Sequence, residues 1–219
     1  MENRTAAGKS HHTRHIITSQ ANAIAETAVY LSHGKLVVFP TDTVYGLGVN
    51  AFNKDAILQL YAVKQRPLTK GIPILLADLS DSEKVAAAIP PAAQVAIEAF
   101  WPGPLTIIVP KHSRLPACIS PNAGIALRMP NHDAARALIR AAGGALATSS
   151  ANRSGQPPTC TGTDALAALQ GSVAAVLDDG PSPGNMPSTI ITFLTPEPTI
   201  LRDGPLTRTE LSQAGVVSL

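Results

Sequence analysis

Residues 35–48 read KLVVFPTDTVYGLG and join the two features that decide the fold, a short apolar run and a polar segment directly after it. Residues 35–39 are rich in β-branched and aromatic side chains and stop at Pro40, which predicts a strand. Residues 40–48 hold two threonine hydroxyls, a carboxylate, a phenol and two glycines. This segment is either a tight turn or, because open sheets bind ligands past the carboxyl ends of their strands, part of a ligand site.

Apolar runs and helical stretches alternate along the rest of the chain in the same way, without an internal repeat. Such alternation is typical of a sheet covered by helices, and therefore of the α/β class. Helices are predicted at residues 21–33, 53–64, 82–88, 92–100, 132–142, 163–169 and 208–213. Strands are predicted at residues 35–39, 72–77, 105–109, 125–129, 145–148, 173–177, 189–193 and 199–201.

Length and composition are those of one folded domain. Of the 219 residues, 45% are apolar and 15% are charged, which suits one core and lacks the charge excess of a disordered chain. We expect a flexible polar lead-in at residues 1–15 and a single domain at residues 16–219. Only 4% of the residues are aromatic, which argues against the base-stacking surfaces of single-strand nucleic-acid binders.

Cysteine usage and hydropathy indicate the compartment. Cys118 and Cys160 form neither a CxxC pair nor a disulfide framework, so we expect reduced thiols and a cytoplasmic protein. No apolar run reaches the roughly 18 residues of a membrane span, and no signal peptide is recognisable. The six histidines show no metal-ligand spacing, so no protein metal site is predicted.

A cluster of cations ends the second predicted helix. Residues 64–70 read KQRPLTK and place Lys64, Arg66 and Lys70 within seven positions. Positive charge complements the dipole at a helix C-terminus, so a solvated helix end is one interpretation. The other is an anion site. Pro67 fixes the chain between Arg66 and Lys70, and a fixed fork of guanidinium and ammonium groups suits a triphosphate.

Small polar residues and two arginines stand near later strands. Residues 147–155 read ATSSANRSG, and Ser188 opens the sequence STI. Such segments line polar pockets or form ordinary Ser/Asn turns, and both interpretations stay open here. Arg128 lies inside the apolar run GIALRMP, where a charge without a partner is costly. Arg202 ends the last predicted strand beside Asp203, which is able to neutralise it.

Together these segments resemble the YrdC-like family of threonylcarbamoyl-AMP synthases over residues 23–205. The motifs keep the family's order: PTDTVYGLG, Lys64 and Arg66 followed by Lys70, WPGPLT at residues 101–106, ALRMP with Arg128, Ser150 and Asn152, STI from Ser188, and LRDG with Arg202. Each motif is weak alone, but chance matches would not keep both order and spacing. The chain resembles the short form of the family, without an extra C-terminal domain, and Gly71 stands where the family often has proline.

The resemblance implies a fold and a site. The fold is a single catalytic α/β domain with a twisted, open mixed sheet, flanking helices and one large cationic cleft. By similarity, ATP is bound by Lys64, Arg66, Lys70, Ser150, Asn152 and Arg202, and L-threonine by Thr43, Arg128, Thr148 and Ser188. Lys64 and Arg66 are the expected catalytic residues, and Arg128 is expected to hold the threonine carboxylate.

The resemblance also implies a reaction, in which ATP, L-threonine and bicarbonate condense into threonylcarbamoyl-AMP and pyrophosphate. The protein would then be a nucleotidyltransferase that serves threonylcarbamoyladenosine modification of tRNA. Mg²⁺ is expected to arrive with ATP and to be held largely by the triphosphate, because no Asp/Glu cluster stands out. A downstream threonylcarbamoyl transferase complex is the expected receiver of the product. A contact with tRNA is a further expectation, and none is expected with a membrane.

Two other functions remain open at this point. One is a non-catalytic module of the same fold that binds double-stranded RNA or tRNA through the cationic cleft. Steeply salt-dependent RNA affinity without ATP turnover would favour it. The net charge of +2 and the scarcity of aromatic residues argue against it. The other is a paralogue with a different carbamoyl- or nucleotide-linked reaction, against which the pair Ser150 and Asn152 argues.

Overall fold

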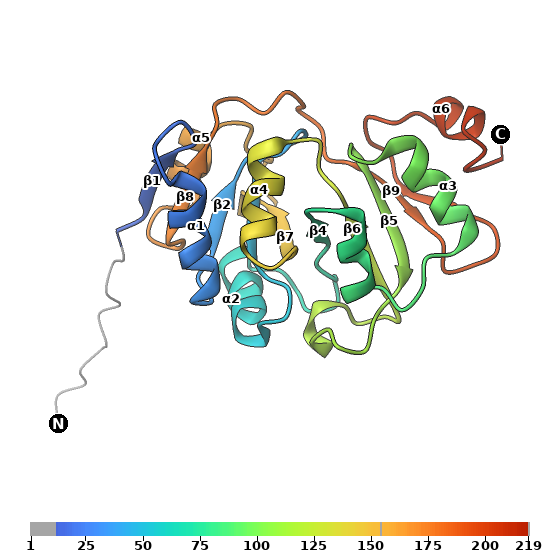
Figure 1. The fold of residues 1–219 in the computed structure, drawn as a ribbon, viewed down its shortest axis with the longest axis horizontal. Coiled ribbons are helices and arrows are strands. Elements are labelled where there is room, and N and C mark those ends of the chain that lie inside the picture. The colour runs from blue at the N-terminus through green and yellow to red at the C-terminus, as the bar shows by residue number, and fades with distance from the viewer. Residues whose placement is uncertain (1–11, 154, 219) are drawn as a thin grey trace.

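Ten strands form one mixed sheet in the computed structural model, which describes residues 12–153 and 155–218 (Figure 1). The strand order is β1-β8-β2-β3-β7-β4-β6-β5-β9-β10, with parallel and antiparallel neighbours interleaved. The strands are β1 (Arg14–Ile17), β2 (Val37–Phe39), β3 (Gly46–Asn50), β4 (Ile74–Leu76), β5 (Leu105–Pro110), β6 (Gly124–Arg128), β7 (Ala145–Ser150), β8 (Ala175–Asp178), β9 (Thr189–Thr192) and β10 (Thr199–Arg202). The predicted α/β class and mixed sheet are therefore confirmed.

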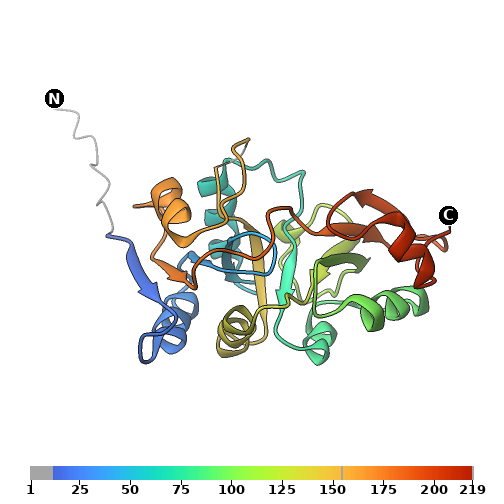
Figure 2. The same cartoon turned by 90° about the horizontal axis from the view of Figure 1, so that it is seen from above.

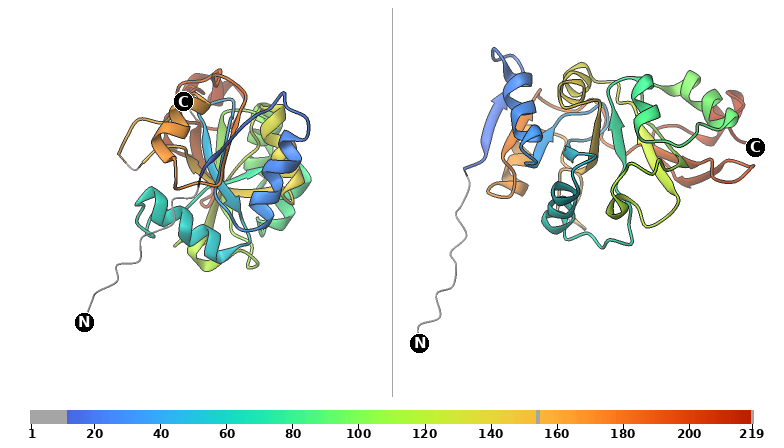
Figure 3. Two further views of the ribbon diagram at one scale, coloured as in Figure 1. Left: turned by 90° about the vertical axis from the view of Figure 1, so that its left-hand side faces the viewer. Right: turned by 60° about the horizontal axis from the view of Figure 1, so that its bottom comes forward.

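Helices cover both faces of this sheet (Figures 2 and 3). They are α1 (Ala23–Ser32), α2 (Lys54–Lys64), α3 (Pro91–Phe100), α4 (Asp133–Ala141), α5 (Gly162–Leu169) and α6 (Arg208–Gln213), with short 3₁₀ helices η1 (Leu79–Lys84) and η2 (Ala117–Ile119). Figure 2 shows α1 and α4 on one side of the strands and α2 and α5 on the other. In the part of the chain that the structure describes, no helix is long and apolar enough to cross a membrane.

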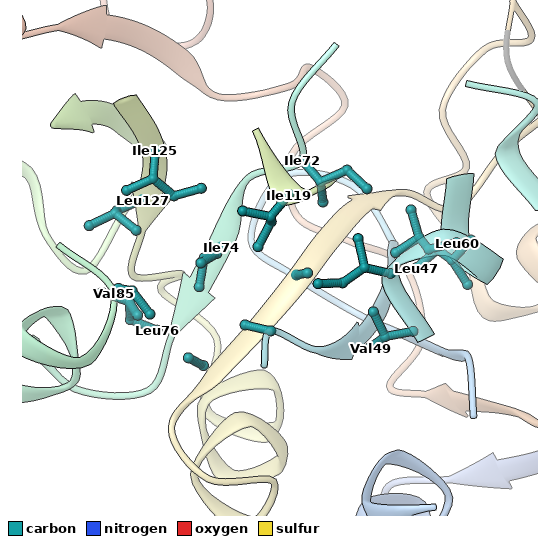
Figure 4. Packing of buried hydrophobic residues seen from close by; sticks show 14 of the residues in the cluster. Leu47, Val49, Leu60, Ile72, Ile74, Leu76, Val85, Ile119, Ile125 and Leu127 are labelled. Atoms are coloured by element: carbon teal, nitrogen blue, oxygen red, sulfur yellow. The ribbon is translucent and has the colours of Figure 1, made fainter. Parts of the chain in front are cut away.

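Two layers of apolar side chains hold the sheet between these helices. Within β2, Val37 and Phe39 pack in one cluster with α1 and α4, while Val38 points to the opposite face and packs in the larger cluster. Figure 4 shows part of the larger cluster, where Leu47 of β3 and Leu60 of α2 meet. Because full burial of one such side chain stabilises the fold by about 1.5–3 kcal/mol, these layers fix the positions of the strand ends.

Two strands were not predicted from the sequence. β1 pairs in parallel with β8, and its first residue, Arg14, falls inside the expected lead-in at residues 1–15. Strand β1 thus includes the last two residues of the expected lead-in, and residues 1–11 lie outside the described residues. The second is β3, which takes up the end of the PTDTVYGLG segment. A short run with two glycines gives little signal for a strand, and only pairing with β2 and β7 stabilises it.

The glycines of β3 serve the packing of the sheet. A Cβ on Gly48 would lie 2.6 Å from the Phe39 ring, and one on Gly46 would lie 2.8 Å from the Thr148 methyl group. From the sequence, residues 40–48 were expected to form one polar segment past a strand. The structure divides that segment into a loop, residues 40–45, and the start of a strand whose glycines make room for neighbouring side chains.

A long connection crosses the molecule from β8 to β9, between which six other strands lie in the sheet (Figure 1). We call residues 179–188 the crossing segment. Its Gly184 amide donates to the Asp42 backbone oxygen at 3.1 Å, and its Ser182 amide donates to the Cys160 backbone oxygen at 2.7 Å. The crossing segment is therefore fastened to the loop that follows β2, and this brings its end at Ser188 to the same edge of the sheet.

Candidate functional site

A pocket of about 740 Å³, counting its open mouth, lies where the loop after β2, the ends of β6 and β7 and the crossing segment meet. It is lined by residues from widely separated parts of the chain. Among the predicted site residues, those that line it are Thr43, Arg66, Arg128, Thr148, Ser150, Ser188 and Arg202. The structure thus brings together most of the predicted ATP-binding and threonine-binding residues. Lys64, Lys70 and Asn152 do not line the pocket.

Arg128 stands at the inner end of this pocket, on the last residue of β6. Its Nε donates to the Gly103 backbone oxygen at 2.9 Å, and its Nη1 donates to the Thr43 hydroxyl at 2.7 Å. Its Nη2 donates to Oδ1 of Asp42, with which it forms an ion pair. Burial lowers the pKa of Arg128, and the Asp42 carboxylate counteracts this by favouring the charged form. The guanidinium is therefore a fixed cation with its plane set by three partners.

Arg66 and Arg202 form the other cationic part of the pocket. Gln65 takes a left-handed conformation, with φ of 50°, which ends α2 and turns Arg66 toward the pocket. Arg66 donates from Nε to the Lys70 backbone oxygen at 3.0 Å and from Nη2 to the Gly71 backbone oxygen at 2.7 Å. Arg202 donates from Nε and Nη2 to the Ser188 backbone oxygen at 3.0 and 2.7 Å.

These two guanidinium groups lack an acidic partner among the described residues, since their hydrogen bonds go to backbone and hydroxyl oxygens. Burial lowers the pKa of Arg66, and burial followed by the charge of Arg66 lowers that of Arg202. Both guanidinium groups line the same pocket, where the charge of Arg66 disfavours the charged form of Arg202. Because these two cations have no carboxylate partner among the described residues, a bound anion would stabilise both of them.

Lys64 is buried beneath the pocket and does not line it. Its Nζ donates to the Ser150 backbone oxygen at 2.7 Å and to the Asn152 side-chain oxygen at 2.9 Å, and it also contacts the Asn152 backbone oxygen. Burial, aided by the charge of Arg66, lowers the pKa of Lys64 to about 8. This lysine therefore holds the end of β7 in place, and its direct contact with ATP, implied by the family resemblance, stays a prediction.

Asn152 and Lys70 also lie outside the pocket lining. The Asn152 amide donates to the Arg153 backbone oxygen at 3.0 Å and to the Gln156 backbone oxygen, and its side-chain oxygen accepts from Ser150 and Lys64. These bonds occupy the side chain inside its own loop. Lys70 is exposed, and its backbone oxygen serves as a partner of Arg66. In this structure both residues shape the site from outside it.

Sequence reasoning missed two side chains of the site. The Thr106 hydroxyl lines the pocket and lies 2.7 Å from the Ser188 hydroxyl, and Asp42 is the ionic partner of Arg128. Both lie inside motifs that were singled out, WPGPLT and PTDTVYGLG, so their presence was visible. The pairings of Thr106 with Ser188 and of Asp42 with Arg128 were not visible in the sequence, because each joins residues more than 80 positions apart.

The described residues contain no group of three or more His, Cys, Asp or Glu side chains placed to hold a metal ion. Asp42 is the one carboxylate in contact with a pocket arginine among them, and it is engaged in that ion pair. The donor set around the pocket consists of hydroxyl, guanidinium and backbone groups. It suits an anionic ligand better than a bare divalent cation.

A mixed sheet with an arginine-lined pocket at its strand ends defines an α/β protein built to bind a small anionic ligand. Comparison with known proteins then gives the family. The chain belongs to the Sua5/YciO/YrdC family, whose model, described as "Telomere recombination", matches residues 29–204.

Several members of this family are similar over most of the chain. The threonylcarbamoyl-AMP synthase of Bacillus subtilis is 38% identical over 193 residues, which are 86% of this chain and 55% of that protein. A putative threonylcarbamoyl-AMP synthase of Mycobacterium tuberculosis is 35% identical over 195 residues, 89% of both chains. The crystal structure of Pyrococcus abyssi Sua5 complexed with L-threonine superposes with a TM-score of 0.88 at 32% identity, covering 92% of this chain and 60% of that one. The chain thus spans little more than half the length of two of these relatives.

Proposed function

We propose that this protein is an enzyme, an L-threonylcarbamoyladenylate synthase of the nucleotidyltransferase class. It would condense ATP, L-threonine and bicarbonate into threonylcarbamoyl-AMP with release of pyrophosphate. The names of the Bacillus and Mycobacterium relatives and the threonine in the Pyrococcus complex support this assignment. Several of the residues expected to bind the two larger substrates line one pocket, which is a requirement for joining them.

The observation that carries the proposal is the division of the pocket into two cationic parts. Arg66 and Arg202 have backbone and hydroxyl partners, whereas Arg128 has a carboxylate and a threonine hydroxyl. The first part suits the triphosphate of ATP, which brings several negative charges. The second suits an amino acid, whose carboxylate needs one cation and whose hydroxyl needs polar partners such as Thr43, Thr148 and Ser188.

The chemistry of the proposed reaction fits this arrangement. The neutral amine of threonine reacts with bicarbonate to form a carbamate and water, and the proton of the original ammonium is released. A carbamate oxygen then attacks the α-phosphorus of ATP, and the bond to pyrophosphate breaks. Negative charge grows on the phosphate oxygens during this step, so fixed donors such as Arg66 and Arg202 lower its barrier. The Ser150 hydroxyl lines the same pocket and adds a further donor.

The two residues expected to be catalytic, Lys64 and Arg66, have different roles in the proposed reaction. Arg66 contacts the transferred nucleotide and Lys64 acts through the Ser150 loop that it holds. Mg²⁺ would come with the triphosphate, whose oxygens supply ligands that the described side chains do not supply as a cluster. When bound, it would neutralise charge on the phosphates.

The setting of the reaction is part of the same proposal. The product would pass to a downstream threonylcarbamoyl transferase complex that modifies tRNA, and a direct contact with tRNA would involve the exposed cations near the pocket mouth, such as Lys70. The free thiols of Cys118 and Cys160 fit a reducing cytoplasm. The alternative of a non-catalytic RNA-binding module is not favoured, because the relatives are synthases and two of the three pocket arginines, Arg66 and Arg128, are half-buried and buried.

The test is direct. The purified protein is incubated with ATP, Mg²⁺, bicarbonate and one amino acid at a time, and pyrophosphate release is followed together with the mass of the nucleotide product. We expect release that depends on L-threonine and a product with the mass of threonylcarbamoyl-AMP. Pyrophosphate release that is indifferent to threonine would contradict the proposal, and salt-sensitive RNA binding without turnover would support the alternative.

A further inference from the structure

The inner end of the pocket carries a nearly buried ion pair. The side chains of Asp42 and Arg128 are 11% and 7% exposed, and Oδ1 of Asp42 accepts from Nη2 of Arg128. The other two pocket arginines have no such partner among the described residues, since Arg66 and Arg202 donate to backbone and hydroxyl oxygens. The pocket therefore has two arginines without an acidic partner among these residues and one, Arg128, whose charge is paired with a carboxylate.

One carboxylate oxygen of Asp42 is not used in the ion pair with Arg128. Its Oδ2 accepts no hydrogen bond from the described residues, and it is absent from the fully buried side-chain atoms that lack a partner, so solvent reaches it. The main chain beneath it is fixed, because the Gly184 amide donates to the Asp42 backbone oxygen at 3.1 Å. Asp42 is not itself among the residues that line the pocket, but Thr41 and Thr43 on either side of it and its partner Arg128 are. Oδ2 is thus a charged acceptor at the wall of the pocket.

The guanidinium of Arg128 has N–H groups that its hydrogen bonds to protein atoms do not use. A guanidinium has five N–H groups. Three are directed to Gly103, Thr43 and Asp42, which leaves two of the five for a ligand. A free carboxylate acceptor and free guanidinium donors in direct contact form a pair of complementary charges, and a zwitterion matches such a pair with its ammonium and carboxylate ends.

We propose that Asp42 is the specificity-determining residue that makes the inner end of the pocket select a zwitterionic amino acid over a plain anion. This inference rests on the proposed function and assigns the recognition of the amino group, which the family resemblance left open. A carboxylate without an ammonium group meets the repulsion of Asp42 and finds Arg128 already neutralised. A zwitterion exchanges one ion pair for two, so its binding leaves no charge uncompensated. The same carboxylate directs the multiply charged triphosphate toward Arg66 and Arg202.

The experiment compares L-threonine with 3-hydroxybutyrate, which is threonine without its amino group. Dissociation constants for both are measured by titration calorimetry on the full chain, in the wild type, Asp42→Asn and Asp42→Glu. We expect the wild type to prefer threonine strongly. Asp42→Asn should lower that preference by about tenfold or more, with weaker threonine binding and equal or tighter 3-hydroxybutyrate binding. Asp42→Glu, which restores the charge, should recover part of the preference.

Controls separate this role from damage to the fold. Asp78→Asn removes an aspartate that also pairs with arginines, but its partners Arg136 and Arg140 do not line the pocket, and it should leave the preference unchanged. If Asp42 had a purely structural role, Asp42→Asn would weaken the binding of both ligands equally. An unchanged threonine preference, or parallel weakening of the two ligands, in a folded Asp42→Asn variant would overturn the inference.

Failure of the proposed function gives a different result. If the wild type binds another amino acid and forms no threonylcarbamoyl-AMP, the comparison is made with that amino acid and its analogue without the amino group. A loss of preference in Asp42→Asn then supports the role of Asp42 while the synthase assignment fails. A wild type that binds no amino acid more tightly than the matching analogue overturns the inference itself.

Discussion

The ammonium nitrogen of Lys64 lies 2.7 Å from the backbone oxygen of Ser150, 86 residues further along the chain. This bond joins the end of α2 to the end of β7 and thereby places the Ser150 hydroxyl on the pocket wall. Lys64 also reaches the Asn152 side chain at 2.9 Å. A lysine that the sequence marks as a ligand contact thus supports, in this structure, the strand end whose Ser150 lines the pocket.

Lys64→Met should destabilise the protein. The substitution keeps most of the volume of the side chain but removes the donor of the buried Asn152 backbone oxygen. It also takes one of the donors from the Ser150 backbone oxygen and from the Asn152 side-chain oxygen. Because each buried acceptor that loses its partner costs about 1–3 kcal/mol, we expect a loss of about 2–4 kcal/mol in the free energy of unfolding, measured by urea denaturation. As a control, Lys70→Met changes an exposed lysine and should cost less than about 0.5 kcal/mol. Equal stabilities of the two variants would contradict the supporting role.

The lowered pKa of Lys64 predicts a pH dependence of stability. Its pKa falls from 10.5 to about 8 in the folded protein because of burial and the charge of Arg66. Between these values the unfolded chain binds a proton that the folded chain has released, so stability from this group rises with pH. The difference in unfolding free energy between wild type and Lys64→Met should therefore increase by about 1–2 kcal/mol from about pH 7.5 to pH 9.5. A constant or shrinking difference would show that the folded pKa is not lowered.

We expect Arg66 and Arg202 to contribute more to ATP binding than Lys70, the exposed cation of the cluster predicted at residues 64–70. Arg66→Ala and Arg202→Ala each remove a pocket guanidinium and should raise the KM for ATP by about tenfold or more, with a smaller effect on the KM for threonine. Lys70→Ala is the matched control, because Lys70 is exposed and outside the pocket lining, and it should change the KM by less than about threefold. Steady-state pyrophosphate release measures all three. A larger effect of Lys70→Ala than of Arg66→Ala would place the triphosphate elsewhere.

Arg128→Ala should act mainly on the amino acid. It removes the cation expected to hold the threonine carboxylate and leaves Asp42 without its ionic partner. Since loss of one partner of a buried, hydrogen-bonded charge pair at a binding site costs about 2–5 kcal/mol of binding energy, we expect threonine affinity to fall by about a hundredfold, with a smaller change for ATP. Arg136→Ala, which removes an ion pair to Asp78 away from the pocket, should leave both constants unchanged. Unchanged kinetics in a folded Arg128→Ala variant would refute the carboxylate assignment.

Gly184→Ala should loosen the crossing segment. A Cβ at this position would lie 2.6 Å from the Asp42 backbone oxygen and 2.9 Å from the Thr43 Cα, and these backbone atoms cannot move aside cheaply. We expect a loss of about 1–3 kcal/mol in stability together with weaker threonine binding. Gly71→Ala is the control, because its nearest neighbour is the Ser120 hydroxyl at 3.3 Å, and its cost should be smaller. Thermal unfolding and threonine titration measure both variants. If Gly184→Ala and Gly71→Ala lower the stability of the protein equally, the crossing segment and the loop after β2 are not in close backbone contact.

The sequence by itself determined the α/β class, the positions of most helices and strands and the motifs that carry the site. These depend on local signals, namely apolar periodicity, caps such as Asn53 and breaks at proline and glycine, which are readable within about ten residues. The strand pairing of β1 and β3 depends on partners elsewhere in the chain, and so neither strand was predicted.

Only the tertiary structure decided which charged side chains face the pocket. In the sequence, Lys64 and Arg66 are two positions apart and look equivalent, yet one is buried against Ser150 and the other lines the pocket. In the same way, Asp42 and Arg128 become an ion pair although 86 positions separate them. The reason is that solvation and pairing of a charge depend on every segment that packs around it, and these segments meet only when the sheet has formed.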